Sequence, residues 1–346
     1  MRRRFLLGSL FLAGVAFAAG LFVRASGTRV DAEPNSSGPP DFAAVVERAL
    51  PGVVHVHNYL ARVRDVPEPG EHSANDDNVG SGFVWSADGW ILTNRHVTEG
   101  AKQILVEIEG RGWFPAVERG SDPMVDVALL KIDADGLVPL PIGSPRTVRR
   151  GQWVLAAGSP YRLPRSFSVG IVSGLERSDV VNPNGYEDYI QTDAAINIGS
   201  SGGPLLDAGG RVIGLNTAIL SRSGGNQGIA FAVPIDVVLQ AAEQLRARGT
   251  IVRSTLGVVV RAASPLESLR LPGGGGLYVT RFATESPARK AGLEEGDVIL
   301  TVDGVATPSR GPLLRTIWTK RGGTVVALEF LRGNQRLVSK ATLIER

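Results

Sequence analysis

Short apolar segments, separated by glycine, proline, asparagine and aspartate, fill the chain from Val53 to about Val233. Among them are 104–108, 153–157 and 212–220. Short strands that recur at regular spacing over such a length are typical of sandwiches and barrels. The pattern therefore predicts a mainly β fold built from paired β-barrels.

Two helices are predicted, one on either side of this β-rich region. The first begins after Asp41, a residue that can cap its N-terminus, and ends at Pro51-Gly52. The second begins at 234–236 and is stopped by Gly249. Its apolar side carries Val237, Val238, Ala241, Ala242 and Leu245. This spacing indicates an amphipathic helix.

The stretch from Gly199 to Pro204 gives the clearest indication of a reactive side chain, because Ser201 lies among glycines. A tight turn of this kind exposes a hydroxyl nucleophile and aims backbone N–H groups at a point where an oxyanion can sit. Its spacing also fits the nucleophile elbow of an α/β-hydrolase, but that fold places its histidine after the serine. All four histidines precede Ser201, which excludes the elbow and leaves the chymotrypsin-type order of His, Asp and Ser.

One histidine stands out as the candidate base. His72 lies in a polar loop that cannot hold a catalytic group rigidly. His55 and His57 alternate with valines, which indicates one face of a strand and ordinary exposed positions. His96 ends an apolar strand that follows the glycine turn at 80–82, and we therefore expect it to be the base.

The third partner of such a triad is a buried carboxylate that orients the imidazole. Asp126 opens the apolar run 127–132, where an unpaired acid would be costly. Asp122 and Asp133 are the alternatives, but both stand in turn-like surroundings. We therefore favour Asp126.

Several motifs, in this order, resemble the HtrA family of serine endopeptidases over roughly residues 40–346. They are Gly80-Ser81-Gly82-Phe83, Ile91-Leu92-Thr93-Asn94-Arg95-His96-Val97, Asp126-Val127-Ala128-Leu129-Leu130-Lys131, the segment 191–197 running into Ser201-Gly202-Gly203-Pro204, and the later strands 211–218 and 228–234. The resemblance implies a chymotrypsin-like double β-barrel with the catalytic residues His96, Asp126 and Ser201. The backbone N–H groups of Gly199 and Ser201 would form the oxyanion hole, with no metal and no organic cofactor. Two residues depart from the family pattern: Ser200 stands where the family usually has Asn, and Ile198 where it usually has Pro.

The same resemblance places the specificity pocket and a regulatory residue. In chymotrypsin-like proteases the pocket floor lies six residues before the nucleophile, which here is Ala195. The pocket wall is expected at Leu215, Asn216 and Thr217. With no acid placed to bind Lys or Arg, we expect cleavage after small or branched aliphatic residues. In the loop 174–178, Arg177 resembles a sensor-loop arginine of DegS-type members of the family.

A second module begins near Ser254 and resembles a PDZ domain. Its carboxylate-binding loop is expected at Thr255, Leu256, Gly257 and Val258. The segments 286–293 and 296–304 resemble the PDZ core, and 313–318 fits the groove-lining helix. A PDZ groove captures a peptide C-terminus by strand addition, with backbone N–H groups holding the carboxylate. Together these segments predict a small α+β peptide-binding domain.

The N-terminus predicts export. Three arginines precede an uncharged apolar stretch from Phe5 to Val23, close to the ~20 residues that cross a bilayer. Arginines before such a stretch keep the N-terminus in the cytoplasm. The alternative is a signal peptide cleaved after Ala16-Phe17-Ala18, which would release a soluble periplasmic protein. We expect a membrane anchor at 1–24 and a flexible linker at 25–40 that is rich in Ser, Pro and Gly.

The charge and the cysteine content of the chain exclude some classes of partner and of site. The net charge is +3, but five arginines within the first thirty residues contribute +5, so the remainder carries −2 (3 − 5). The basic pI therefore does not indicate nucleic-acid binding. The absence of cysteine excludes disulfides, thiolate metal sites and a lipoprotein anchor.

The expected organisation is an anchor, a trypsin-like protease domain at 41–250 and a PDZ domain at 254–346. This resembles DegS-type members, and it implies a single-pass inner-membrane homotrimer whose folded domains face the periplasm. C-termini of misfolded outer-membrane proteins would bind the PDZ domain, and the protease would cleave a membrane-bound anti-sigma factor to start an envelope-stress response. The alternative is a PDZ-bearing peptide sensor or chaperone with an inactive protease scaffold.

Overall fold

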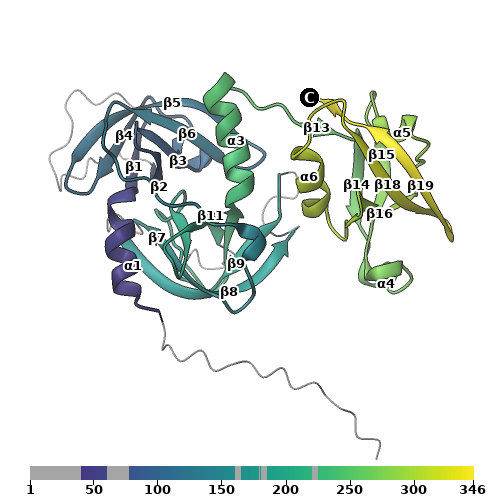
Figure 1. Ribbon diagram of the computed structural model, residues 1–346, viewed down its shortest axis with the longest axis horizontal. Coiled ribbons are helices and arrows are strands. Elements are labelled where there is room, and N and C mark those ends of the chain that lie inside the picture. The colour runs from purple at the N-terminus through teal and green to yellow at the C-terminus, as the bar shows by residue number, and fades with distance from the viewer. Residues whose placement is uncertain (1–39, 61–77, 160–164, 179, 181–184, 220–224) are drawn as a thin grey trace, which may run out of the picture. The chain divides into compact units, whose positions relative to one another are not determined.

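The computed structural model describes residues 40–60, 78–159, 165–178, 180, 185–219 and 225–346 (Figure 1). All but the first of these residues belong to one compact unit, Asp41–Arg346. The predicted anchor, nearly all of the predicted linker and His72 lie outside the described residues. Among the helices of the described part, none has both the length and the apolar character needed to cross a membrane.

The first barrel closes on itself in the strand order β1-β2-β3-β6-β5-β4. Its strands are β1 (Val53–Tyr59), β2 (Asn78–Ser86), β3 (Trp90–Thr93), β4 (Gln103–Ile108), β5 (Gly112–Asp122) and β6 (Val127–Ile132). Helix α1 (Phe42–Ala49) precedes it, with its N-terminus capped by Asp41 as predicted, and the 3-10 turn η1 (Leu50–Gly52) leads into β1. The one-turn helix α2 (Arg95–Thr98) follows β3.

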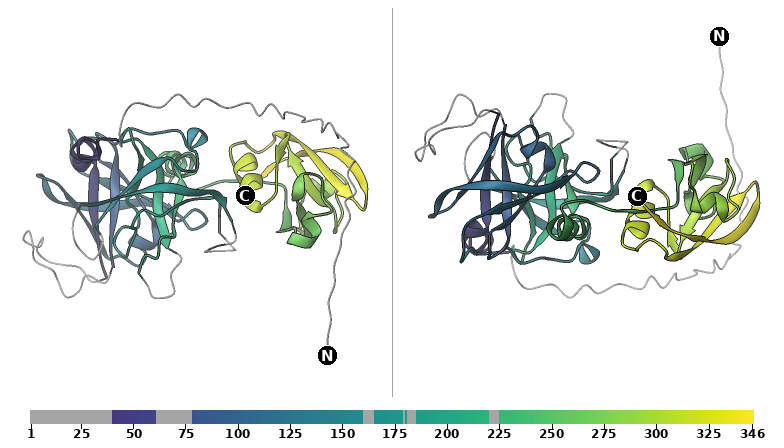
Figure 2. Two further views of the ribbon diagram at one scale, coloured as in Figure 1. Left: turned by 90° about the horizontal axis from the view of Figure 1, so that it is seen from below. Right: turned by 90° about the horizontal axis from the view of Figure 1, so that it is seen from above.

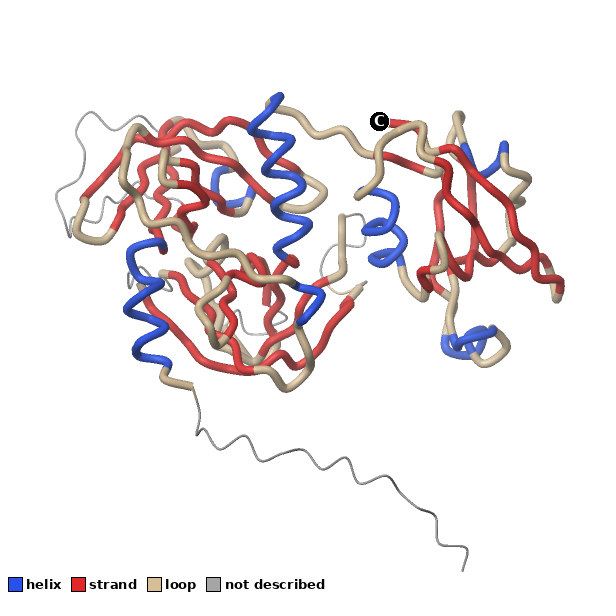
Figure 3. The backbone as a smooth tube through the Cα atoms, viewed as in Figure 1, coloured by secondary structure: helices blue, strands red, loops and turns tan. Residues whose placement is uncertain are grey.

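The second barrel closes in the order β10-β11-β12-β9-β8-β7. The 3-10 turn η2 (Pro145–Thr147) precedes its strands β7 (Trp153–Gly158), β8 (Ser166–Arg177), β9 (Tyr189–Thr192), β10 (Pro204–Asp207), β11 (Val212–Ile219) and β12 (Ala230–Pro234). The two closed barrels confirm the predicted mainly β, chymotrypsin-like fold. Figure 3 shows the predominance of strand over helix along the backbone.

Helix α3 (Ile235–Arg248) joins the two barrels. It ends at Gly249 in the left-handed conformation (φ 72°), as predicted. The predicted apolar side, together with Ile235, is buried. The helix contacts β5 and β6 of the first barrel and β11 and β12 of the second (Figure 1). Its apolar face therefore contributes to one continuous core with both barrels.

The third group of strands, drawn from green to yellow in Figure 2, forms the PDZ sheet. Its order is β14-β15-β16-β18-β19, with β17 paired to β16 and a separate β13–β20 ribbon. The strands are β13 (Ser254–Thr255), β14 (Val258–Ala262), β15 (Leu277–Phe282), β16 (Val298–Val302), β17 (Val305–Ala306), β18 (Val325–Arg332), β19 (Gln335–Thr342) and β20 (Ile344–Glu345). The helices are α4 (Pro265–Ser268), η4 (Pro272–Gly274), α5 (Pro287–Lys290) and α6 (Arg310–Trp318). Strand β14 lies at the edge of this sheet, and the predicted segment 313–318 forms the second half of α6.

Candidate active site

His96 and Asp126 meet at the ends of two neighbouring strands. His96 lies in α2, directly after β3, and Asp126 directly precedes β6, the antiparallel neighbour of β3. The Nδ1 atom of His96 lies 2.6 Å from Oδ2 of Asp126. The backbone N–H of His96 donates to the other carboxylate oxygen at 3.0 Å. Both oxygens of one carboxylate therefore fix the position of a single histidine.

The backbone of Asp126 is in the left-handed region, with φ 59°. For a residue other than glycine this costs about 1–2 kcal/mol. Its carbonyl oxygen offsets part of that cost, because it accepts hydrogen bonds from the backbone N–H of Arg95 (3.2 Å) and the side-chain amide of Asn94 (2.8 Å). The expectation of a buried carboxylate is only partly met, since 27% of the side chain is exposed. The position at the mouth of a strand, outside the barrel core, accounts for this.

The other candidate acids have different surroundings. Asp122 is fully buried, where it pairs with Arg253 and accepts the N–H of Met124. Asp133 is exposed. Among the described residues, it is Asp126 that contacts His96, once through each carboxylate oxygen.

His55 and His57 do not occupy exposed positions, so that expectation is wrong. Only 4% and 5% of their surfaces are exposed. Strand β1 pairs with β2 on one side and with β4 on the other, and all seven of its residues are buried. Alternation with valine therefore does not indicate solvent here, because Trp113 of β5 and Glu107 of β4 lie against the face that carries the histidines.

The serine turn leaves two backbone donors free. The N–H groups of Ser200, Gly202 and Gly203 donate to carbonyl oxygens at 2.9, 2.8 and 3.1 Å. Among the described residues, the N–H groups of Gly199 and Ser201 have no hydrogen-bond partner. These are the two donors that the sequence analysis assigns to an oxyanion hole, and the geometry leaves them available for an anion.

The two neighbouring serines differ in exposure. Ser200 is 4% exposed, and its Oγ accepts the N–H of Asn197 at 3.5 Å. Ser201 is only partly buried, and its hydroxyl donates to the carbonyl of Thr217 at 3.4 Å. The more accessible hydroxyl therefore belongs to Ser201, despite the two departures from the family pattern at Ile198 and Ser200.

Asn94 links the serine to the histidine–aspartate pair, a role that the sequence analysis misses. Its side-chain amide donates both to the carbonyl of Asp126 and to the hydroxyl of Thr217, at 2.8 and 2.7 Å. The carbonyl of the same Thr217 accepts the Ser201 hydroxyl. In the sequence, this role is indicated by the position of Asn94 in the histidine motif, two residues before His96.

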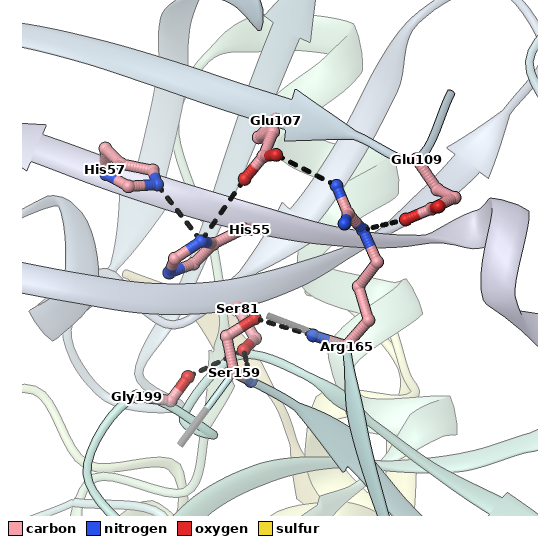
Figure 4. Close-up of polar contacts among 8 residues, drawn as sticks. All are labelled: His55, His57, Ser81, Glu107, Glu109, Ser159, Arg165 and Gly199. Carbon is pink, nitrogen blue, oxygen red and sulfur yellow. Dashed lines mark hydrogen bonds and ion pairs between the residues drawn. The ribbon is translucent and has the colours of Figure 1, made fainter. Parts of the chain in front are cut away.

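Ser81 connects the two barrels beneath the serine turn. Its N–H donates to the carbonyl of Ser201 at 2.8 Å, and its hydroxyl donates to the carbonyl of Gly199 at 2.6 Å (Figure 4). The same hydroxyl accepts the N–H of Ser159 at 2.9 Å. Gly202 follows with φ 85°, and a Cβ there would lie 2.2 Å from the carbonyl oxygen of Ser81. Only glycine fits this close approach.

The predicted pocket residues fall into two groups. Ala195 is exposed and its carbonyl accepts the Ser168 hydroxyl at 2.8 Å. Leu215 and Asn216 are fully buried. Leu215 packs in the core, and the amide of Asn216 donates to two backbone carbonyls of its own barrel. The side chains of Leu215 and Asn216 therefore face the interior, whereas Ala195 is exposed and Thr217 is 9% exposed.

Two family models match the chain: a trypsin-like peptidase domain at residues 80–215 and a PDZ domain at residues 254–343. A probable periplasmic DegP-like serine endoprotease of Halomonas elongata is 38% identical, over 86% of this chain and 69% of its own length. The solved structure of the HtrA-type protease AlgW with a tripeptide is 37% identical, with a TM-score of 0.73 over 89% of this chain and 98% of that one. The serine endoprotease from Yersinia pestis is 32% identical, with a TM-score of 0.63, over 90% of this chain and 100% of that one.

The chain belongs to the HtrA family of serine endoproteases. It carries one PDZ domain after the protease barrels. No metal or cofactor is needed for the chemistry of a serine, a histidine and an aspartate.

The PDZ domain of this HtrA protein has an apolar groove between β14 and α6. It is lined by Thr255, Leu256, Val258, Val259, Val260, Arg310, Leu313, Leu314 and Ile317. Gly257 has φ 66°, and its N–H donates to the hydroxyl of Thr255 at 2.9 Å. The predicted loop 255–258 therefore lies at one end of a groove whose open side is the edge of β14.

The sequence predicts Arg177 in a loop. In the structure it is instead the last residue of strand β8. The strand continues because Arg177 pairs with Tyr189 of β9 across a bulge. Its Nε donates to Oε1 of Gln191 at 2.7 Å. The arginine therefore lies directly before the segment 178–188, which joins β8 to β9 in the sequence.

Helix α6 contacts this same segment. The hydroxyl of Ser178 donates to that of Ser309 at 3.2 Å, and the guanidinium of Arg310 donates to the carbonyl of Gly185 at 3.0 Å. Arg315 forms an ion pair with the carboxylate of Asp188, whose side chain is only 1% exposed. One short helix therefore lines the peptide groove and contacts the segment that precedes the serine motif.

Burial raises the pKa of Asp188 to about 6, although the charge of Arg315 acts in the opposite direction. Burial dominates because removal of a carboxylate from water is costly. The hydroxyl of Tyr186 donates to the same carboxylate at 3.2 Å.

Replacement of Asp188 by Asn tests this pKa. A carboxyl whose pKa is raised in the folded state contributes stability that is fully present below about pH 4 and is lost as the pH rises through about 6. The Asp188→Asn variant has no carboxyl at this position and does not lose this stability as the pH rises. The difference in unfolding free energy, variant minus wild type, should therefore increase by about 3 kcal/mol between pH 4 and pH 7. Urea unfolding across this range measures the difference. The exposed Asp133→Asn variant controls for the loss of a charge, and a difference for Asp188→Asn that stays constant with pH would contradict the assignment.

Proposed function

We propose that His96, Asp126 and Ser201 hydrolyse peptide bonds in exported proteins. The observation that carries this proposal is the double contact of Asp126 with His96. A carboxylate on Nδ1 holds the imidazole in the tautomer whose Nε2 accepts a proton. The histidine is then a general base, and the nearby serine is the group that it activates.

The chemical steps follow from these positions. The Ser201 oxygen attacks the peptide carbonyl carbon, while its proton passes to Nε2 of His96. The N–H groups of Gly199 and Ser201 hold the oxygen that becomes negative. The imidazolium gives its proton to the leaving amine, and water then hydrolyses the acyl-enzyme by the same route. The uncharged Ala195 supports cleavage after small or branched aliphatic residues.

The hydroxyl of Ser201 donates to the carbonyl of Thr217 in this structure. It must turn away from that acceptor before it can give its proton to His96. We interpret this arrangement as a resting state, which supports regulation of the protease. A ligand can shift a resting state only by binding the active state more tightly.

Peptide binding at the PDZ groove is the proposed signal. A peptide C-terminus would add as a strand to the edge of β14, with its carboxylate at the loop 255–258. Across the groove, α6 presents Leu313 and Ile317 to the peptide, while Arg315 holds Asp188. The HtrA-type protease AlgW has been solved with a tripeptide and with a decapeptide. These observations support coupling of the groove, through α6 and Arg177, to the serine turn.

The physiological setting is proposed from the family resemblance. C-termini of misfolded outer-membrane proteins would be the activating peptides, and a membrane-bound anti-sigma factor would be the substrate whose cleavage starts a stress response. A homotrimer is the proposed assembly. DegP-like relatives are named periplasmic, which supports a periplasmic position for the protease and PDZ domains.

The apolar stretch from Phe5 to Val23 supports retention in the inner membrane. We expect the mature protein to sediment with membranes and to keep its N-terminus. Edman sequencing that begins near Ala19 or Ala25 would show instead that the segment is cleaved.

Ser201→Ala should abolish peptide hydrolysis, with a loss of about 10³-fold or more in kcat. Ser200→Ala should keep most of the activity, because that hydroxyl is buried. A fluorophosphonate probe should label wild type and Ser200→Ala but not Ser201→Ala. Peptide fragments separated by mass spectrometry report the cleavage sites. If Ser200→Ala is the inactive variant, the assignment of the nucleophile is wrong.

Arg177→Ala and Arg315→Gln should each blunt the rise in hydrolysis on addition of a C-terminal peptide. Neither side chain lines the groove, so peptide affinity measured by fluorescence anisotropy should stay near the wild-type value. The exposed Arg270→Gln variant of the PDZ domain is the matched control. Deletion of residues 254–346 should remove the peptide dependence altogether. Hydrolysis that no C-terminal peptide changes, before or after this deletion, would rule out the coupling.

A further inference from the structure

Two histidines and a glutamate meet inside the first barrel, away from the residues proposed for catalysis. His55 and His57 lie two residues apart on β1, and Glu107 lies opposite His55 on β4 (Figure 4). Nε2 of His57 lies 3.1 Å from Nδ1 of His55. Nδ1 of His55 lies 3.6 Å from Oε2 of Glu107. One nitrogen or oxygen atom from each of the three side chains lies within 4.8 Å of the others.

These spacings match the edges of a small coordination polyhedron. A tetrahedral Zn²⁺ with bonds of about 2.0–2.1 Å places neighbouring ligand atoms about 3.3–3.4 Å apart. The two measured separations, 3.1 and 3.6 Å, lie on either side of that value. Small rotations of the side chains are therefore sufficient to surround an ion.

The burial of the cluster is a separate observation. His55 is 4% exposed, and its Nε2 has no hydrogen-bond partner among the described residues. The nitrogen of this buried ring that faces His57 and Glu107 is Nδ1, so the centre of the cluster lies on the Nδ1 side of His55. Glu107 is 20% exposed, which gives an ion a way in.

Neighbouring charged residues fix the orientation of the Glu107 carboxylate. Arg165 donates to Oε1 of Glu107 at 3.0 Å and leaves Oε2 facing His55. Nε of Arg165 also forms an ion pair with Glu109 at 2.6 Å, so the two carboxylates and the guanidinium sum to −1 before any cation binds. Hydrogen bonds of this kind to a ligating carboxylate are typical of metal sites.

The ring of His57 is fixed by packing. Trp113 of β5 meets it edge to face, with ring centroids 4.4 Å apart. The ring of His55 lies on it at 4.1 Å. The two imidazoles are thus held close together before a ligand arrives, which reduces the entropy lost on binding.

We propose that His55, His57 and Glu107 bind a divalent transition metal ion, with Zn²⁺ as the ion that fits best. Two imidazoles and one carboxylate form a donor set that Zn²⁺ uses, with a fourth position for water. Mg²⁺ and Ca²⁺ prefer oxygen ligands throughout and do not fit two nitrogens. The ion would join β1 to β4 and so stabilise the first barrel. His55 is also the β1 partner of Ser81, the residue that holds Gly199.

The test uses the untagged full chain carrying Ser201→Ala, which prevents self-cleavage. Titration calorimetry with Zn²⁺ should show one ion bound per chain, and Tm should rise with the free Zn²⁺ concentration. Glu107→Gln and His57→Asn should each weaken binding by at least about 100-fold, since they remove a ligand. Near-UV circular dichroism without metal checks that these variants remain folded. His72→Gln is the matched control and should bind like the parent.

A second measurement needs no change to the ligands. Cu²⁺ bound beside His57 should quench the fluorescence of Trp113, and Trp113→Phe should remove that part of the quenching. Zn²⁺ in excess should restore the fluorescence of the parent by competition. The proposal is overturned if no Zn²⁺ binds. It is also overturned if binding survives Glu107→Gln and His57→Asn but disappears in His96→Gln, because the ion would then lie at the histidine proposed as the base.

Discussion

The hydrogen bonds of Ser81 are the interaction on which the candidate site depends. The histidine and the aspartate come from the first barrel, and the serine and its turn come from the second. Ser81 is fully buried in β2, and it reaches Ser201, Gly199 and Ser159 across the boundary with its N–H and its hydroxyl. Because a buried polar group without a partner is costly, these bonds favour a single relative position of the two barrels. That position sets the serine turn beside the strand that ends in the histidine motif.

The polar links around this contact act as a connected network. Asn94 ties the carbonyl of Asp126 to the hydroxyl of Thr217, and Thr217 accepts the hydroxyl of Ser201. Each of these links crosses from one barrel to the other or supports one that does. Both side-chain N–H groups of Asn94 are used in these bonds, so its position is tied to residues of both barrels. The precision of the site therefore comes from residues that take no part in bond cleavage.

Much of the fold can be predicted from patterns of neighbouring residues in the sequence. Short apolar runs and turn residues predict the barrels, the cap at Asp41 and the stop at Gly249 predict two helix ends, and the glycines around Ser201 predict the turn. These signals need only neighbouring residues. The burial of His55 and His57 could not be predicted, because it depends on Trp113 and Glu107, which lie some fifty residues away and pack against the histidine face of β1. The links of Asn94 and the extension of β8 to Arg177 depend in the same way on pairing between distant segments.

The position of Gly202 bears on when, during folding, the candidate site can form. Its close approach to the carbonyl of Ser81 shows that the serine turn packs tightly against β2 of the first barrel. Neither barrel alone holds Ser201 next to His96, because the serine comes from the second barrel and the histidine from the first. A chain that is still unfolded, or half folded, is therefore not a protease, and it cannot cut itself or its neighbours during synthesis and transport. Folding of both barrels therefore precedes any activity, and the proposed peptide signal acts on the folded chain.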